Sequence, residues 1–314
     1  MLKANSSTGL IRNLASIAQC NTMKIALFGK NFDEQRVPFV KIMVETLRQN
    51  HVDLVVYKPY FDMLKSEIDL PANIGFFSSH DDIDEDVKML FSIGGDGTLL
   101  DVLPIIRETG IPVLGINMGR LGFLSSVSKQ NIEQAISFII QGRYSLINRS
   151  LLQLESPVGL FADLNYALNE LTVFRKETTS LIVINVFVDD AFVNAYWADG
   201  LIIATPTGST AYSLSAGGPI LVPTAENFVI TPIATHNLSV RPIVISDKSI
   251  IRLKVVGRHD KYTVSMDSRS ALIDQSVDIV IKKADFGVKL VNMEGQDFFG
   301  TIREKLLWGL DIRN

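Results

Sequence analysis

Residues 94–97, Gly-Gly-Asp-Gly, place one carboxylate, that of Asp96, among three glycines. An apolar run precedes them and a second one follows, which predicts a buried strand, a tight turn and the start of a helix. Free N–H groups in such a turn bind anions, phosphate above all. A carboxylate repels phosphate, so Asp96 is explained if it holds a metal ion or takes a proton from an attacking hydroxyl. The first hypothesis is therefore phosphoryl transfer.

Two familiar phosphate-binding motifs do not match. The chain has no G-x-x-x-x-G-K-[ST], which excludes a P-loop protein, and Gly95-x-Gly97-x-x-Leu100 misses the dinucleotide fingerprint G-x-G-x-x-G. A turn without chemistry is the alternative for the four residues taken alone. The loop resembles that of the superfamily of NAD kinases, diacylglycerol kinases and phosphofructokinases, which by itself implies only a kinase-like protein.

The elements that must position Asp96 alternate between strand and helix from residue 23 to about 147. Apolar runs predict strands at 23–29, 54–57, 74–77, 89–93 and 111–116, and apolar periodicity predicts helices at 40–50, 99–109 and 132–141. In the second helix Pro104 predicts a kink or a short first segment, and Gly110 a C-terminal stop. A second glycine-rich loop, 115–123, is expected at the same edge of a parallel sheet, where such sheets bind ligands.

The pattern changes near residue 148. Strand-like runs then follow at short intervals to about residue 292, among them 277–281 and 288–291, and predict an all-β domain. We expect an α/β N-terminal domain with an open, mostly parallel sheet (23–147) and an all-β C-terminal domain (148–292). A helix within about 293–314 is expected to pack back on the first domain. Residues 1–22 lack acidic residues, as in an organellar presequence, but we favour a disordered extension.

Composition sets further limits. The chain has 314 residues, 47% of them hydrophobic and 20% charged, and no apolar run approaches the roughly 18 residues of a membrane span. Its net charge of −4 and the lack of a basic tail argue against a nucleic-acid partner. Cys20 is the sole cysteine, which excludes an internal disulfide and fits a reducing cytoplasm. The four histidines lack zinc-site spacing, and the acidic run 81–86 is interpreted as a solvated loop.

Three further stretches have residue types suited to a nucleotide. In 198–219, small residues and hydroxyls let a flat ligand lie against the backbone, and Tyr212 offers a stacking face. Asn169 and Glu170 form an amide–carboxylate pair that can bind an adenine edge and a ribose diol; an ordinary strand-end turn is the alternative. The stretch 232–242 contains His236, which we interpret as a structural residue.

Together with the glycine loop, these stretches closely resemble the NAD kinases, ATP- or polyphosphate-dependent enzymes that make NADP, from about residue 23 to the C-terminus. The resemblance implies that Asp96 accepts the proton of the 2′-hydroxyl of the adenosine ribose and that Gly97 lies against NAD. It also implies that Asn169 and Glu170 hold the adenosine and that Asp199 reaches the nicotinamide end. The residues implied around the adenine are Thr210, Ala211, Tyr212, Ser213 and Ser215, and those facing the phosphates are Gly94, Gly95 and Thr98.

The same resemblance implies partners and a cofactor. Members of the family use a divalent metal, usually Mg²⁺, with ATP, and form homodimers or homotetramers through the β domain; the sequence identifies no dedicated protein ligand for the metal. Two residues depart from the family pattern. Trp197 stands where many bacterial members have arginine, and Arg269 where some have glutamine. Both positions fall in the implied substrate cleft, so the choice between NAD and NADH is open.

Two alternatives to an NAD kinase stay open at this point. A related kinase acting on a lipid or a sugar phosphate would share the glycine loop but leaves the segment 205–218 unexplained. A dinucleotide-binding regulator without turnover would share the pocket, but the intact Asp96 speaks against it. The phosphoryl donor, the oligomer size and any allosteric effector are not decided by the sequence.

Overall fold

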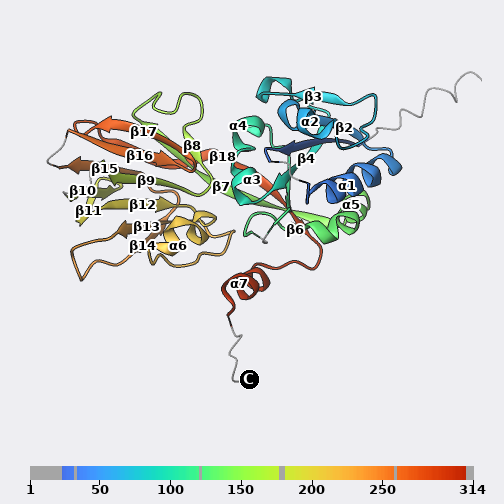
Figure 1. Ribbon diagram of the computed structural model, residues 1–314. Helices are drawn as coiled ribbons and strands as arrows, with labels where there is room; N and C mark the ends of the chain where they lie inside the picture. Colours follow the sequence, from blue (N-terminus) through green and yellow to red (C-terminus); the bar gives the residue numbers. More distant parts are fainter. Residues whose placement is uncertain (1–22, 32–33, 120–121, 177–180, 258–259, 309–314) are drawn as a thin grey trace, which may run out of the picture.

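Two parts of the molecule, one α/β and one rich in β-strands, lie side by side and are joined by long strands (Figure 1). The computed structural model describes residues 23–31, 34–119, 122–176, 181–257 and 260–308. The predicted fold class, an α/β domain with a mostly parallel sheet and an all-β domain, is confirmed. The expectation for residues 1–22 lies outside the described residues.

The α/β part is built on parallel strands in the order β5-β4-β1-β2-β3, with β6 paired to β5. The strands are β1 (Lys24–Gly29), β2 (Asp53–Tyr57), β3 (Gly75–Phe77), β4 (Val87–Gly94), β5 (Val113–Asn117) and β6 (Val127–Ser128). The helices that flank the sheet are α1 (Val37–Gln49), α2 (Lys58–Leu64) and α5 (Ile132–Ile140). The predicted apolar face of α1 is buried, and β4 is buried except for Lys88. Both elements were recognisable in the sequence because their apolar residues pack in the core.

The segment after β4 is broken as Pro104 predicts. It forms α3 (Asp96–Leu100) and α4 (Leu103–Ile106), and Pro104 sits in the first turn of α4, where a missing N–H costs no helical hydrogen bond. The prediction that Gly110 ends this helix is wrong. The chain leaves α4 at Arg107, whose φ is 41°, and the positive φ of Gly110 serves the later turn into β5.

The β-rich part contains two antiparallel layers. One is a separate six-stranded sheet in the order β14-β13-β12-β9-β16-β17. Its strands are β9 (Glu170–Arg175), β12 (Gly200–Ala204), β13 (Asn227–Ile233), β14 (Ile243–Ser246), β16 (Lys261–Met266) and β17 (Arg269–Asp274). The other continues the parallel sheet and consists of β7 (Tyr144–Ser156), β8 (Tyr166–Ala167), β10 (Ile182–Val188), β11 (Ala191–Ala198), β15 (Ile251–Val256) and β18 (Ile279–Met293).

One strand, β18, links the two parts. The prediction of separate strands at 277–281 and 288–291 is wrong, because residues 279–281 and the whole second run belong to this 15-residue strand. Its first residues pair antiparallel with β15, and Leu290 pairs parallel with Val113 of β5. The polar residues between the two runs fall where the pairing with β7 changes register, between Lys283 and Gly287. A single sheet therefore runs through both parts of the molecule.

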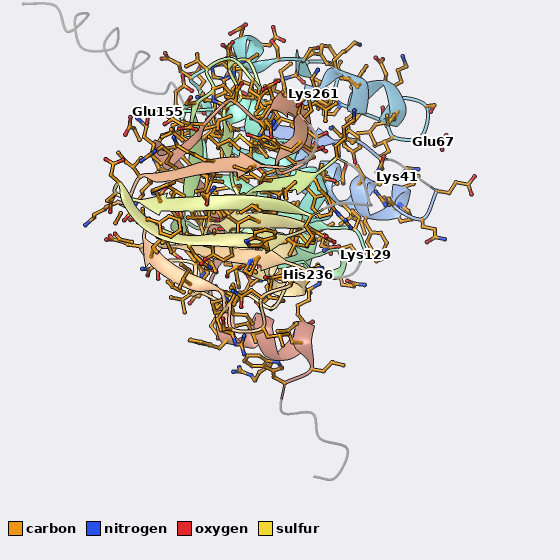
Figure 2. The ribbon with its side chains drawn as sticks, turned by 90° about the vertical axis from the view of Figure 1, so that its left-hand side faces the viewer. Lys41, Glu67, Lys129, Glu155, His236 and Lys261 are labelled. Atoms are coloured by element: carbon orange, nitrogen blue, oxygen red, sulfur yellow. The ribbon has the colours of Figure 1, made fainter. Side chains whose placement is uncertain are left out.

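The last helix, α7 (Phe298–Leu306), lies below the junction of the two parts (Figure 1). Figure 2 shows the molecule from the β-rich end; of the side chains labelled there, Lys41, Glu67, Glu155 and Lys261 are exposed. Among the described residues, no helix combines the length and the apolar character needed to cross a membrane.

Candidate functional site

Asp96 is the first residue of α3, directly after the buried strand β4. Its carboxylate accepts three backbone hydrogen bonds from the end of the second glycine-rich loop and the two residues that follow it. Phe123 N donates to Oδ2 at 2.7 Å, and Leu124 N and Ser125 N donate to Oδ1 at 3.2 and 3.0 Å. The two loops that the sequence places at one sheet edge are therefore joined through this side chain.

The glycines around Asp96 differ in what they make room for. A Cβ at Gly94 would lie 2.2 Å from Thr98 Oγ1, and one at Gly122 only 1.7 Å from Asp96 Oδ1. These two glycines let protein atoms pack. At Gly95 and Gly97 a Cβ would meet no described atom within 4 Å, and neither residue has a positive φ. The fold itself does not require glycine at those two positions, so they leave open space beside Asp96.

The Asp96 helix and the residue that precedes Asn169 contribute to one hydrophobic cluster. Leu99 of α3 and Leu168, which precedes Asn169, belong to the same buried cluster. The hydroxyl of Tyr166 also donates to the carbonyl of Leu103 at 3.4 Å, across the junction of the two parts. Figure 1 shows α3 and α4 facing β8 at this junction.

The loop 168–170 is held from below by a buried acid that sequence reasoning missed. Asp267 accepts hydrogen bonds from the backbone N–H groups of Leu168, Asn169 and Glu170 at 2.8–3.3 Å. Burial raises the pKa of the Asp267 carboxyl, although the amide hydrogen bonds act in the opposite direction. No sequence motif marked this residue, because its partners are backbone groups.

Glu170 is the second buried acid of this region. Its side chain is 9% exposed, and Oε2 has no hydrogen-bond partner among the described residues. Burial, reinforced by the charge of Asp267, raises the pKa of Glu170 to about 7; a backbone hydrogen bond from Tyr212 partly offsets this. Near neutral pH the side chain can therefore act as donor or acceptor toward a ligand.

The segment after β12 is fastened to the same loop. Thr205 donates to the Asn169 carbonyl through its backbone N at 2.9 Å and to the Leu168 carbonyl through its hydroxyl at 2.5 Å. A Cβ at Gly208 would lie 2.0 Å from the Asn169 carbonyl oxygen, so only glycine permits this contact. A 3-10 turn (Gly208–Thr210) and the short helix α6 (Tyr212–Ser215) follow.

The residues implied around an adenine differ in exposure. Tyr212 and Ser215 are exposed, and Thr210 and Ala211 are partly exposed. Ser213 is buried instead, and its hydroxyl lies 2.9 Å from that of Thr231 on β13. Its side chain serves the packing of α6, so in this conformation only its backbone can meet a ligand.

Asp199 lies at the opposite end of β12. The five-residue strand separates it from Thr205, six residues further on, a distance of about 20 Å at ~3.3 Å per residue. Its carboxylate is 3.0 Å from the guanidinium of Arg175. Trp197, two residues earlier, is more than half exposed on β11. Asp199 is therefore one strand length away from Thr205, which is bonded to the Asn169 loop.

Arg269 has a role in packing. Its guanidinium donates to the carbonyls of Leu164 and Tyr166 and lies 5.9 Å from the Phe161 ring centroid. It is also 3.9 Å from Asp267. These contacts tie the β17 strand to the segment that leads into the Asn169 loop.

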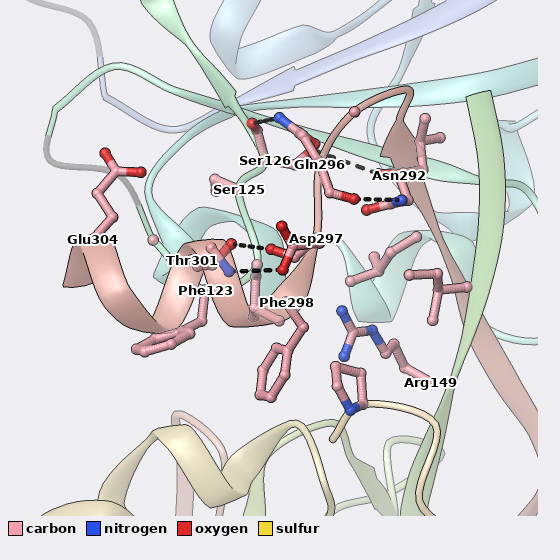
Figure 3. Close-up of a pocket in the computed structure, with 18 residues that line it drawn as sticks. Phe123, Ser125, Ser126, Arg149, Asn292, Gln296, Asp297, Phe298, Thr301 and Glu304 are labelled. Carbon is pink, nitrogen blue, oxygen red and sulfur yellow. Dashed lines mark hydrogen bonds between the residues drawn. The ribbon is translucent and has the colours of Figure 1, made fainter. Parts of the chain in front are cut away.

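A cavity of about 290 Å³ adjoins the loop that holds Asp96 (Figure 3). Gly122 to Ser126 form one wall, residues 295–304 of α7 and the preceding turn form another, and Arg149 of β7 lines it. Sequence reasoning did not single out this cavity, because it forms between segments that are far apart in the chain. The described residues contain no group of three or more His, Cys, Asp or Glu side chains able to hold a metal ion.

Comparison with known proteins gives consistent matches over nearly the whole chain. A family model described as the ATP-NAD kinase N-terminal domain matches residues 25–144, and one described as the ATP-NAD kinase C-terminal domain matches 168–293. Proteins named NAD kinase from Flavobacterium psychrophilum and Flavobacterium johnsoniae are each 45% identical over 294 residues, covering 93% of this chain and 100% of the relative.

Solved structures are similar in the same way. The crystal structure of yeast NADH kinase complexed with NADH matches with a TM-score of 0.81 and 25% identity, over 93% of this chain and 90% of that one. An NAD kinase from Archaeoglobus fulgidus in complex with ATP matches with a TM-score of 0.69 and 26% identity, over 91% and 99% of the two chains.

Proposed function

The chain belongs to the NAD kinase family, and we propose that Asp96 is the residue that accepts the proton in its reaction. The enzyme transfers a phosphoryl group from ATP to the 2′-hydroxyl of the adenosine ribose of NAD, which gives NADP. A lipid or sugar-phosphate kinase is not favoured, because full-length relatives and both family models agree on NAD.

One observation carries the role of Asp96. A carboxylate offers about four acceptor sites, and three are used by the amides of residues 123–125. Oδ2 accepts only one of these bonds, so it has a lone pair left for a hydroxyl proton. Gly95 and Gly97, the neighbours of Asp96 in the chain, leave open space in which a ribose can approach the backbone.

The chemistry then needs few protein groups. The ribose O2′ forms a bond to the γ-phosphorus as the bond from that phosphorus to ADP breaks, and the hydroxyl proton passes to Asp96 Oδ2. Such transfers depend mainly on positioning and on neutralising phosphate charge. We place NAD with its adenosine at Asn169, Glu170 and the 210–215 segment, and the donor phosphates at Gly94, Gly95 and Thr98. The nicotinamide end extends toward Asp199.

A divalent cation, Mg²⁺, is part of this proposal. Mg²⁺ binds mainly through substrate phosphates and water, and here it supplies charge neutralisation on the triphosphate. We assign it no dedicated protein ligand. We also propose polyphosphate as a second donor, because ATP and polyphosphate both present a chain of phosphates to the site.

Two further parts of the proposal concern the whole protein. We expect a homodimer or homotetramer formed through the β-rich part, because the edge strand β11 exposes Phe192 and Trp197. We also expect a cytoplasmic enzyme, since a single cysteine suits a reducing compartment.

The test is to incubate the protein with NAD and MgATP and to detect NADP with an NADP-specific dehydrogenase. We expect NADP to form. In Asp96→Asn we expect turnover to fall by about 10²–10⁴-fold with NAD affinity little changed, as for loss of a general base. NAD binding without NADP formation by the wild type would favour a regulator, and unchanged turnover in Asp96→Asn would refute the role of Asp96.

A further inference from the structure

Arg149 is a buried cation that faces a cavity. It lies on β7, its side chain is 8% exposed, and its guanidinium points into the cavity between the loop 122–126 and α7 (Figure 3). In the part of the chain that the structure describes, this guanidinium has no hydrogen bond or ion pair, and its Nε is buried without a partner. By contrast, Arg175, Arg252 and Arg143 each lie within 3.0 Å of a carboxylate.

An unpaired charge in such a place requires an explanation. Removing a guanidinium from water is costly unless a counter-ion or hydrogen-bond acceptors replace the lost hydration. Burial lowers the pKa of Arg149 to about 10, so the group is still a cation at neutral pH. A planar guanidinium with five donors matches phosphate well, and the cavity gives a phosphate room to reach it.

We propose that this cavity is a phosphate subsite and that Arg149 binds the phosphate chain of the phosphoryl donor there. The inference rests on the proposed function, since it assumes that a phosphate donor is used. It adds a positively charged donor-binding residue that neither the glycine loop nor any sequence motif supplies.

The position of the cavity suits the donor. Its wall includes Phe123 to Ser125, whose amides hold the Asp96 carboxylate, so a chain bound at Arg149 lies one loop away from the proton acceptor. The opposite wall carries the acids Asp297 and Glu304. These carboxylates repel a polyanion that binds without a cation. A triphosphate binds together with a divalent cation, which offsets this repulsion. The pyrophosphate of NAD needs no such cation, so the cavity suits the donor better than NAD.

The walls also explain how the subsite is kept in shape. Asp297 caps α7 by accepting from Gly300 N at 2.8 Å, and Gln296 donates to the carbonyl of Ser126, so α7 is tied to the loop across the cavity (Figure 3). Arg149 is therefore presented inside a preformed enclosure and not on an open surface.

The experiment compares the wild type with Arg149→Met, which keeps an unbranched apolar stem and removes the guanidinium with its charge. Arg48→Met is the control, because Arg48 is an exposed arginine on α1 paired with Glu45. Binding is measured by thermal shift with inorganic tripolyphosphate and Mg²⁺ and, separately, with NAD; KM values for MgATP and NAD are measured in parallel.

We expect tripolyphosphate to stabilise the wild type and Arg48→Met but not Arg149→Met, while NAD stabilises all three. We also expect the KM for MgATP to rise at least tenfold in Arg149→Met with the KM for NAD within about twofold. Because an unpaired buried charge is removed, the ligand-free variant should be as thermostable as the wild type, which excludes misfolding as the cause.

Three results would overturn the assignment. An unchanged KM for MgATP and an unchanged tripolyphosphate shift would show that Arg149 does not bind the donor. A rise confined to the KM for NAD would assign the cavity to the NAD pyrophosphate. An Arg149→Met protein that is much less stable than the wild type without ligand would show that the arginine is structural. Failure of the proposed function is distinct, because the wild type itself would then make no NADP.

Discussion

At the scale of single residues, Glu170 links the site to pH. Its pKa is raised from 4.5 to about 7, chiefly by burial and then by the charge of Asp267. An acid whose pKa is higher in the folded state than in the unfolded state binds its proton more tightly when the protein is folded. Its contribution to the free energy of unfolding is therefore complete below the unfolded-state pKa and is lost as the pH rises through the folded-state pKa. The window for Glu170 therefore extends from about pH 4.5 to about pH 7.

Glu170→Gln should remove this pH dependence. We expect the free energy of unfolding of the ligand-free wild type to fall, relative to the variant, by up to about 3 kcal/mol between pH 5 and pH 8. The measurement is urea unfolding of both proteins at several pH values. Glu226→Gln, at an exposed glutamate, is the control and should follow the wild type. Parallel curves for wild type and Glu170→Gln would show that Glu170 titrates normally.

The glycines around Asp96 allow a second prediction at this scale. Gly97→Ala adds a methyl group where no described atom lies within 4 Å, and alanine favours the helix by up to about 1 kcal/mol. We expect an unchanged or slightly higher Tm, together with a KM for NAD or MgATP raised at least tenfold because the methyl group occupies ligand space.

Gly94→Ala provides the matched contrast. Its Cβ would lie 2.2 Å from Thr98 Oγ1, so the protein itself must shift and the Tm should fall. Both variants add one methyl group, but only Gly94→Ala disturbs the packing of the protein, whereas Gly97→Ala fills open space and is expected to change binding alone. If Gly97→Ala binds both substrates normally, the open space beside Asp96 is not the ligand site.

At the scale of elements, three separate segments meet around one acid. Asp267 follows β16, and its carboxylate holds the loop 168–170; Thr205, after β12, holds the same loop from its other side. Asp267 has a φ of 49°, a conformation that asparagine tolerates well. Replacing Asp267 by Asn therefore tests the hydrogen bonds without adding backbone strain.

Asp267→Asn should destabilise the protein by about 1–3 kcal/mol. Asparagine keeps one acceptor oxygen, but its NH₂ group then faces a donor, and the buried N–H of Leu168 loses its partner. Chemical unfolding measures the loss. The control is Asp274→Asn at an exposed turn. Asparagine keeps the oxygen that accepts from Ser276, so we expect a loss of stability of less than about 0.5 kcal/mol. Equal effects of the two changes would show that the loop does not depend on Asp267.

The sequence was informative where side-chain patterns decide the structure. The run 89–100 was recognisable as strand, turn and helix because its apolar residues and its glycines are close neighbours in the sequence. The amides of 123–125 were not recognisable as partners of Asp96, since any residue supplies an N–H. The continuity of β18 was missed for a related reason: its polar middle is explained only by its change of partners between the two parts. Arg149 gave no signal because its burial and its cavity arise from segments distant in the chain.

At the scale of the whole molecule, the continuous sheet places the two parts in a fixed relation. β7 and β18 run from one part into the other, so the Asp96 loop and the Asn169 loop are positioned by paired strands and not by a flexible linker. The sheet ends at β11, whose outer side has no strand partner among the described residues. Exposed apolar side chains on such an edge favour pairing with another chain.

Phe192 tests whether this edge forms the expected oligomer. Its ring is 59% exposed, and an aspartate there would put a charge into an interface built on β11 but leave the monomer's core untouched. We expect the wild type to have the mass of a dimer or tetramer in size-exclusion chromatography with light scattering, and Phe192→Asp to shift toward the monomer. Val158→Asp, at a residue 92% exposed in the turn after β7, should keep the wild-type mass. A wild type that is monomeric at micromolar concentration, or a Phe192→Asp protein of unchanged mass, would place the interface elsewhere or remove it; β11 would then need another reason for its exposed aromatic residues.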